Sequence, residues 1–391
     1  MRDAELGYFE SLDKSGYKFL RCSSRPEAQL WVDRGMLLAW AFNHEEAINC
    51  FLNAIGVDSS GCAMAHWGLA QALCPNYNNP CMTRAELQRA AQHNALALHI
   101  LESGGAAAIT DADLGLQRAL VIAQRELVSD PDAFNSVASA EDETAFFLAR
   151  GRKYTDAVRG VHEDTFRTRG STTVRTSVRD QVEVKSIYIA ALMNLRPWKM
   201  WAPEDDLTRK SCALFPLDNS VNTGHTQLWL QHPGCCHFHV HLMEGAPTKS
   251  QVLEAREAAQ SLRDKWPACG HLLHMASHID VHLGQYSAGV AVNTAAVVAD
   301  EAFASFRGTN NYYHTYRLHT YNQLVWSASL DGQYGTAKRA AEDIINTTPP
   351  AILNKYRDFV EPVFANIWYV LVRFGKFQEV VHRPLPSLEE N

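Results

Sequence analysis

Apolar residues recur at helical spacing along most of the chain. In the segments 28–42 and 363–374, for example, apolar side chains return every three or four residues. Alternating runs of β-branched residues, which would indicate strands, are few. The pattern therefore predicts an all-α protein.

Short turns of similar sequence separate the helical segments. In each, a glycine is followed after one or two residues by an aromatic residue and then by small or apolar residues. Small residues let two antiparallel helices approach closely, and the aromatic residue packs the second helix against the first. This turn motif occurs in the segments 151–158, 283–300, 331–345 and 374–381.

A related turn is expected before the segment 42–58. Asn43 is predicted to cap a helix there, with Glu46 three residues later. These turns resemble those of the tetratricopeptide repeat, a helix–turn–helix unit of about 34 residues. We therefore expect a superhelical stack of antiparallel helix pairs, forming a single domain over residues 1–391.

Composition and charge narrow the class of protein. The 391 residues are 46% hydrophobic and 20% charged, as in folded globular proteins, and the formal net charge is −7. The absence of a basic footprint argues against nucleic-acid binding. No apolar run is long enough to span a membrane, and the first residues lack the apolar core of a signal peptide. Nine cysteines without a framework fit reduced thiols, so we expect a cytoplasmic protein.

The most basic stretch of the chain lies within residues 163–180. It is rich in Thr, Ser and Arg. We expect a surface loop there, and the sharper alternative is a lid over a substrate.

Histidines are concentrated in one part of the sequence, where eleven of the seventeen lie between His225 and His319. One group of four histidines, near residues 271–282, has spacings of three, four and four residues, which place its members on one stripe of a helix. Two histidines four residues apart on a helix can bind one metal ion. The group of four comprises His271, His274, His278 and His282.

Two other segments supply candidate ligands. His237 and His241 are four residues apart, with Glu244 on the same helical face, and His232 lies in the loop that precedes them. His319 lies three residues before Asn322 near the start of another predicted helix. Because neighbouring first helices of a helix-pair stack line one wall, we expect these side chains to converge. The predicted metal ligands are His232, His237, His241, His274, His278 and His319.

Several motifs resemble those of a family of bacterial and fungal tetratricopeptide-repeat proteins. They read FNHEEAINCF (42–51), CAMAHWGLAQALCPNYN (62–78), ALMNLRPWKMW (191–201), HPGCCHFHVH (232–241) and HLLHMASHI (271–279). The resemblance implies a buried site rather than a peptide groove. All the predicted ligands except His319 occupy positions that match the motifs of this family. The other matching positions are His44, His66, Trp67, Asn76, Tyr77 and Asn78. This chain has Asn322 and Ala190 where relatives often read His and Glu, which implies an altered site.

Ligation by several imidazoles suits copper, iron, zinc or nickel rather than magnesium or calcium. We expect a transition-metal oxidase or oxygenase acting on a small metabolite, with copper or iron preferred and zinc possible. His44, His66 and Glu244 are the candidate catalytic residues, for proton transfer or support of the ligands.

Two alternatives stay open. A zinc-type hydrolase or lyase would use Glu244 as a general base, and a scaffold would bind protein partners without chemistry. The expected partner is a small-molecule substrate. The sequence leaves open whether the chain forms a homo-oligomer.

Overall fold

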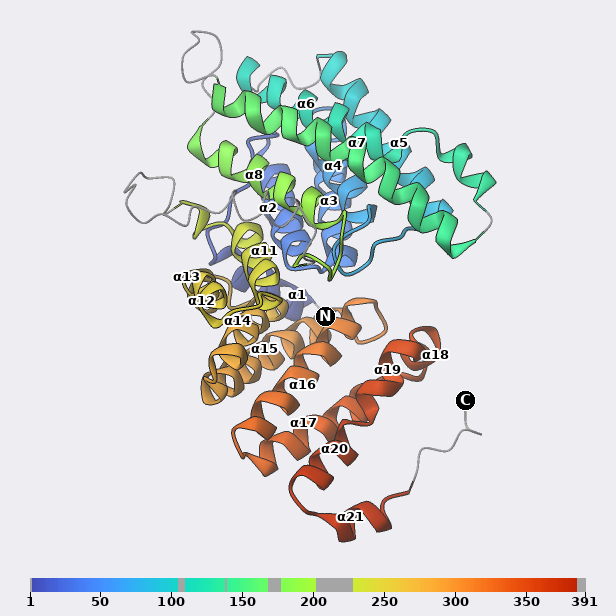
Figure 1. Ribbon diagram of the computed structural model, residues 1–391. Helices are drawn as coiled ribbons and strands as arrows, with labels where there is room; N and C mark the ends of the chain where they lie inside the picture. Colours follow the sequence, from blue (N-terminus) through green and yellow to red (C-terminus); the bar gives the residue numbers. More distant parts are fainter. Residues whose placement is uncertain (1, 105–109, 138, 168–176, 202–227, 385–391) are drawn as a thin grey trace. The chain divides into compact units, whose positions relative to one another are not determined.

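The computed structural model describes residues 2–104, 110–137, 139–167, 177–201 and 228–384. The chain divides into two compact units (Figure 1). We call Gly16–Pro247 the N-terminal unit, and Met1–Ser15 together with Thr248–Asn391 the C-terminal unit. Each is described by itself, and the single domain expected from the sequence stays a prediction.

The elements described in the N-terminal unit are helices, joined by irregular segments such as 16–25 and 74–83. Its elements are α2 (Pro26–Trp40), α3 (His44–Val57), α4 (Ala63–Leu73), α5 (Arg84–Glu102), α6 (Asp111–Val128), the short 3-10 helix η1 (Pro131–Ser136), α7 (Ala140–Arg167), α8 (Val178–Met193) and α11 (Pro233–Glu244).

The C-terminal unit begins with the first helix of the chain and continues after the N-terminal unit. Its elements are α1 (Arg2–Asp13), α12 (Lys249–Glu254), α13 (Arg256–Lys265), α14 (Gly270–Leu283), α15 (Tyr286–Arg307), α16 (Tyr313–Leu330), α17 (Tyr334–Thr347), α18 (Pro350–Lys355), α19 (Arg357–Phe364), α20 (Asn366–Arg373) and α21 (Phe377–His382).

Helices that follow one another in sequence pack against one another in space. This holds from α2 to α8 in the N-terminal unit and from α14 to α17 in the C-terminal unit (Figure 1). The turns between α2 and α3, α14 and α15, and α16 and α17 are short, as in antiparallel helix pairs. The expected all-α class and the stacking of helix pairs are confirmed.

Three of the glycine turns predicted from the sequence are confirmed. Gly284, Gly332 and Gly375 each follow a helix and have φ values of 77°, 78° and 67°. Glycine reaches this left-handed region without the steric cost of a Cβ atom, and it therefore ends one helix and redirects the chain into the next. Asn43 also caps α3 as expected, because its side chain accepts the backbone N–H of Glu46 at 3.4 Å.

The turn predicted at 151–158 is wrong. Gly151 lies inside α7, which runs without interruption from Ala140 to Arg167. A Cβ atom at this position would lie 3.3 Å from the side chain of Leu195. The glycine therefore serves close packing beside the segment that follows α8, rather than a change of direction.

The basic segment 163–180 is partly helical. Its first residues complete α7, and its last residues begin α8. Residues 168–176, where the loop or lid is expected, lie outside the described residues.

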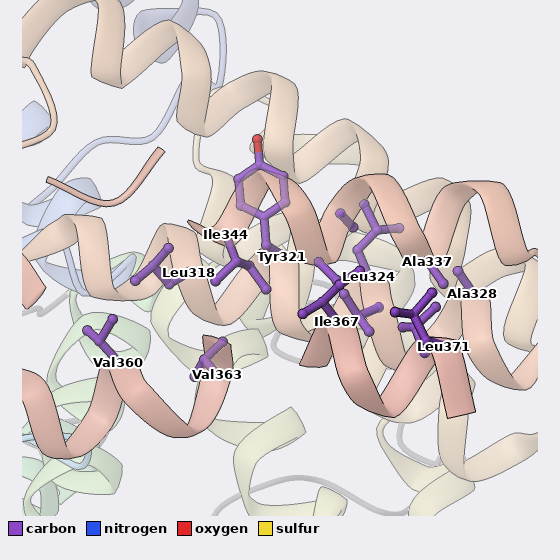
Figure 2. Packing of buried hydrophobic residues seen from close by; sticks show 14 of the residues in the cluster. Leu318, Tyr321, Leu324, Ala328, Ala337, Ile344, Val360, Val363, Ile367 and Leu371 are labelled. Atoms are coloured by element: carbon purple, nitrogen blue, oxygen red, sulfur yellow. The ribbon is translucent and has the colours of Figure 1, made fainter. Parts of the chain in front are cut away.

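Apolar residues of α16, α17, α19 and α20 form a hydrophobic core near the C-terminal end of the C-terminal unit. Figure 2 shows Leu318, Tyr321 and Leu324 of α16 packed against Ile344 of α17 and against residues of the last helices. Because α16 also carries a candidate ligand, this core fixes the helix that the site requires.

The first three helices of the N-terminal unit meet around one aromatic ring. Phe51 of α3 is fully buried. A Cβ atom on Gly35 of α2 would lie 2.7 Å from this ring, and one on Gly68 of α4 would lie 2.5 Å from it. The two glycines therefore permit the close approach of their helices to Phe51.

Substitution of Gly68 by alanine is expected to destabilise the protein by about 1–3 kcal/mol, the usual cost of adding a methyl group to a packed core. Urea denaturation of the variant measures this loss. Gly56→Ala is the control, because nothing lies within 4 Å of a Cβ atom there. Equal stability of both variants would contradict the packing described for Phe51.

Within the described residues, none of the helices combines the length and apolar character needed to cross a bilayer.

Candidate metal centre

The histidine stripe predicted for 271–282 lies on α14. His271 and His274 are fully buried, His278 is half-buried and His282 is exposed. The last residue of the stripe therefore faces solvent, where α14 ends at its glycine turn. The inner part of the stripe can form a site.

Three histidines come together in the C-terminal unit. His274 and His278 project from α14, and His319 projects from the neighbouring α16. The ring centroid of His274 lies 4.8 Å from that of His278 and 4.6 Å from that of His319. One ring nitrogen from each residue lies within 4.8 Å of the other two. We call these residues the histidine triad.

The spacing of the triad suits a transition-metal ion. Nε2 of His274 and Nε2 of His278 are 2.9 Å apart. An ion bound at about 2.0–2.1 Å from each nitrogen accommodates this separation, with a nearly right angle between the two bonds. The triad can therefore hold a metal ion, and three protein ligands leave further coordination positions for water or substrate.

Asn293 of α15 orients the first of these ligands. Its side-chain Nδ2 donates to the carbonyl of Gly289 at 2.8 Å, which fixes the orientation of the amide. Its Oδ1 then accepts a hydrogen bond of 2.9 Å from Nδ1 of His274. The proton of the neutral imidazole is thereby held on Nδ1, and Nε2 keeps the lone pair that a metal requires. Asn293 is fully buried, so water does not compete for this contact.

Loss of this acceptor is expected to weaken metal binding. Asn293→Leu keeps a side chain of similar size but cannot hold the proton of His274 on Nδ1. We expect a fall in metal affinity of about 10–100-fold, the usual effect of removing a partner of a metal ligand. Competition with a coloured chelator measures this change. Asn293→Asp, which still accepts the hydrogen bond, is expected to retain more of the affinity, and equal losses in both variants would contradict the role of Asn293.

Asn322, which departs from the motif of the resembling family, has another partner. Its Oδ1 accepts a hydrogen bond of 2.7 Å from Asn366 at the start of α20. This contact ties α16 to α20. In this arrangement the amide oxygen serves packing between helices.

The other predicted ligands lie in the N-terminal unit. His237 and His241 are one turn apart on α11, and both are buried. Nδ1 of His237 donates to the carbonyl of Trp40 at 2.6 Å. Nδ1 of His241 donates to Oε1 of Glu244 at 2.7 Å. Glu244 therefore contacts a candidate ligand directly, while its catalytic role stays a prediction.

His232 caps the N-terminus of α11. Its Nδ1 accepts the backbone N–H of Cys235 at 3.1 Å, so the ring carries its proton on Nε2. Nε2 lies 2.9 Å from Oε2 of Glu183 and donates to it. Both ring nitrogens are thus engaged within the fold.

Glu183 was not identified from the sequence. It is fully buried and also accepts hydrogen bonds from Tyr17 at 2.9 Å and from the indole N–H of Trp40 at 3.2 Å. It lies in an ordinary helical stretch of α8, and no motif distinguishes it. The one available signal is that an acidic residue occupies a helical position where the pattern predicts an apolar one.

The two candidate catalytic histidines lie at separate places in the N-terminal unit. His44 begins α3 and stacks on Phe42, with ring centroids 5.7 Å apart. His66 of α4 lies beside His93 of α5, with their Nδ1 atoms 2.9 Å apart. Burial lowers the pKa of each to about 4, and nearby His93 contributes to the shift of His66. Both rings are therefore neutral at pH 7, and each is a weaker base than an exposed imidazole.

A cavity of about 710 Å³ opens elsewhere in the N-terminal unit. Its lining is polar and combines basic residues with acidic ones, among them Lys18, Arg21, Arg179, Asp113 and Asp180. None of the described residues that line it is a histidine, and the candidate ligands of α11 are not among them.

No model of a known protein family matches this chain. No curated protein matches it either. The family resemblance drawn from the motifs therefore stays an expectation, whereas the stacked helix pairs stand on the structure.

Of the predicted ligands, the structure brings together His274, His278 and His319 in the C-terminal unit, and His237 and His241 in the N-terminal unit. His232 is engaged with Glu183 instead. The convergence of all predicted ligands on one site stays a prediction.

Proposed function

We propose that the protein is a transition-metal enzyme that oxidises a small metabolite with dioxygen. The observation that supports this proposal is the histidine triad together with Asn293, which presents the Nε2 lone pair of His274. A buried imidazole with its other nitrogen held by a fixed acceptor is the usual arrangement of a metal-bound histidine.

The chemistry of the donors favours copper or iron, with zinc as the third candidate. Neutral imidazoles suit these metals, whereas magnesium and calcium prefer oxygen ligands. A bound copper or iron ion would supply electron transfer to dioxygen. In an oxidase reaction, the substrate loses two electrons and two protons, and dioxygen takes them up to give hydrogen peroxide.

The choice of redox chemistry over hydrolysis rests on the all-imidazole donors of the triad. Asn293 and His271 lie beside His274, and Tyr316 lies beside His271. A zinc hydrolase needs a general base beside the metal-bound water. Glu244, the expected base, accepts a hydrogen bond from Nδ1 of His241 in the N-terminal unit. The hydrolase stays the alternative, with Glu244 as its candidate base.

The fold is compatible with a second reading. We infer that the helix pairs are degenerate tetratricopeptide-like units, and such units often bind peptides. A scaffold does not require three converging histidines, one of which, His274, has its tautomer fixed by Asn293, so the enzyme is the better account of this site.

Metal analysis followed by a redox test distinguishes these functions. The full chain is purified without a histidine tag, and its metal content is measured by mass spectrometry. The metal-loaded protein is then reduced without oxygen and exposed to dioxygen while electron paramagnetic resonance is recorded. Copper or iron that is reoxidised supports the oxidase. Bound zinc would favour the hydrolase, and failure to bind any of the three metals would overturn the proposal.

A further inference from the structure

The two buried histidines of α11 form a pair of their own in the N-terminal unit. The ring centroids of His237 and His241 are 4.8 Å apart, and one ring nitrogen of each lies within 4.8 Å of the other. The two side chains are 0% and 3% exposed. Their spacing of one helical turn places both rings on the same face of α11.

Both rings are held in the tautomer that leaves Nε2 able to bind a metal. A backbone carbonyl and a carboxylate can only accept, so Trp40 and Glu244 each accept a hydrogen bond from an Nδ1–H group, and the proton stays on Nδ1. Nε2 of His237 and Nε2 of His241 therefore both carry lone pairs. The two adjacent rings thus have the same tautomer, fixed by two different acceptors, and this arrangement suits metal binding.

Backbone strain gathers around the same pair. Among the described residues, three that are not glycine have positive φ, and two of them, Phe42 at 58° and Trp198 at 63°, contact His241. Phe42 also lies 4.4 Å from His237 between ring centroids. The turn before α3 thus holds Phe42 in a conformation for which the later turns use glycine. Strain of this kind persists where a site requires a side chain in a fixed place.

Aromatic side chains enclose the pair on the side of His241. The ring of Tyr77 lies 5.0 Å from that of His241 and 4.8 Å from that of Trp198. Tyr77 is buried, while Trp198 is 59% exposed. The exposed indole marks the part of this enclosure that faces solvent.

From these observations we propose that the N-terminal unit binds a metal ion of its own through Nε2 of His237 and Nε2 of His241. Glu244 and the Trp40 carbonyl act as positioning groups for the two ligands. Two protein ligands leave coordination positions for water or for a small ligand beside Tyr77 and Trp198. The proposed function assigns an ion to the C-terminal unit, so this inference adds a second ion to the chain.

Counting the bound ions tests the proposal. The full chain is stripped with a chelator, returned to copper(II) alone by equilibrium dialysis, and analysed for metal. We expect two ions in the wild type, one in His237→Ala and one in His274→Ala. His239→Ala is the matched control on α11, because His239 packs against Trp229 with ring centroids 5.3 Å apart, and it should retain two ions.

A second measurement avoids any loss of folding in the alanine variants. Copper(II) quenches nearby indoles, so titration should quench the fluorescence of the wild type more than that of Trp198→Phe. Glu244→Gln, which keeps the size of the side chain but not its charge, should weaken the ion of the N-terminal unit by about 10–100-fold. Glu244→Gln should bind the other ion, which is the one that His274→Ala loses, with unchanged affinity.

The outcomes separate this inference from the proposed function. A single ion that survives in His237→Ala and disappears in His274→Ala would overturn the second ion and leave the triad intact. A single ion lost in both variants would also overturn it, because one ion would then need both sets of ligands. If the chain binds no copper, the inference of a second ion is overturned. If it binds neither zinc nor iron as well, the proposed function is also overturned.

Discussion

Replacement of His274 by alanine is expected to abolish metal binding by the C-terminal unit. His274 is the fully buried member of the triad, and its Nε2 lies 2.9 Å from that of His278. Removing a partner of a metal ligand costs about 10–100-fold in affinity, so removing the ligand itself should cost at least about 100-fold. Competition between the protein and a coloured chelator, read with zinc or copper, measures the change.

The matched control for this variant lies on the same helix. His282 belongs to the stripe predicted from the sequence but is exposed. His282→Ala removes an imidazole from α14 and should leave the metal affinity unchanged. Equal affinity of the His274 variant and the wild type, with both folded by circular dichroism, would remove the triad as a metal site.

The stacking of helices could be predicted because its signals are local. Gly284, Gly332 and Gly375 end helices through their own backbone conformation, and Asn43 caps α3 through a contact three residues away. Gly151 shows the limit of such signals. A similar motif occurs there, but Gly151 lies inside α7 and serves packing against Leu195, and only this contact distinguishes the two uses.

The ligands could be predicted in part, because spacing along a helix is also local. It placed His274 beside His278, and the position of His319 at a comparable point of a later helix brought it to the same site. Asn293 could not be predicted, since its contact with His274 depends on how α15 lies against α14. Glu183 could not be predicted for a similar reason, because its partner His232 is 49 residues away in the sequence.

A buried carboxyl group at the start of α14 provides the second large effect. Asp300 of α15 is 2% exposed, and its Oδ1 accepts a hydrogen bond of 3.0 Å from Tyr313. A Cβ atom on Gly270 would lie 2.0 Å from the same oxygen, so glycine is required where α14 begins. Burial raises the pKa of Asp300 to about 7, although the hydrogen bond from Tyr313 acts in the opposite direction.

The raised pKa determines the sign of the pH dependence. In the unfolded chain the group titrates near 3.8, so between that pH and about 7 the folded protein binds the extra proton. Its contribution to stability is therefore complete below pH 3.8 and is lost as the pH rises to about 7. The difference between the two pKa values corresponds to roughly 4 kcal/mol, at about 1.4 kcal/mol for each unit.

Asp300→Asn should remove this dependence. The amide stays neutral at every pH and can still accept the hydrogen bond from Tyr313. Relative to the wild type, the variant should gain roughly 4 kcal/mol of unfolding free energy between pH 4 and pH 8, because only the wild type must bury a charge at the higher pH. Urea denaturation of both proteins across this range gives the difference. If that difference were constant with pH, Asp300 would have to be ionised throughout, and α14 would start beside a buried charge rather than a neutral carboxyl group.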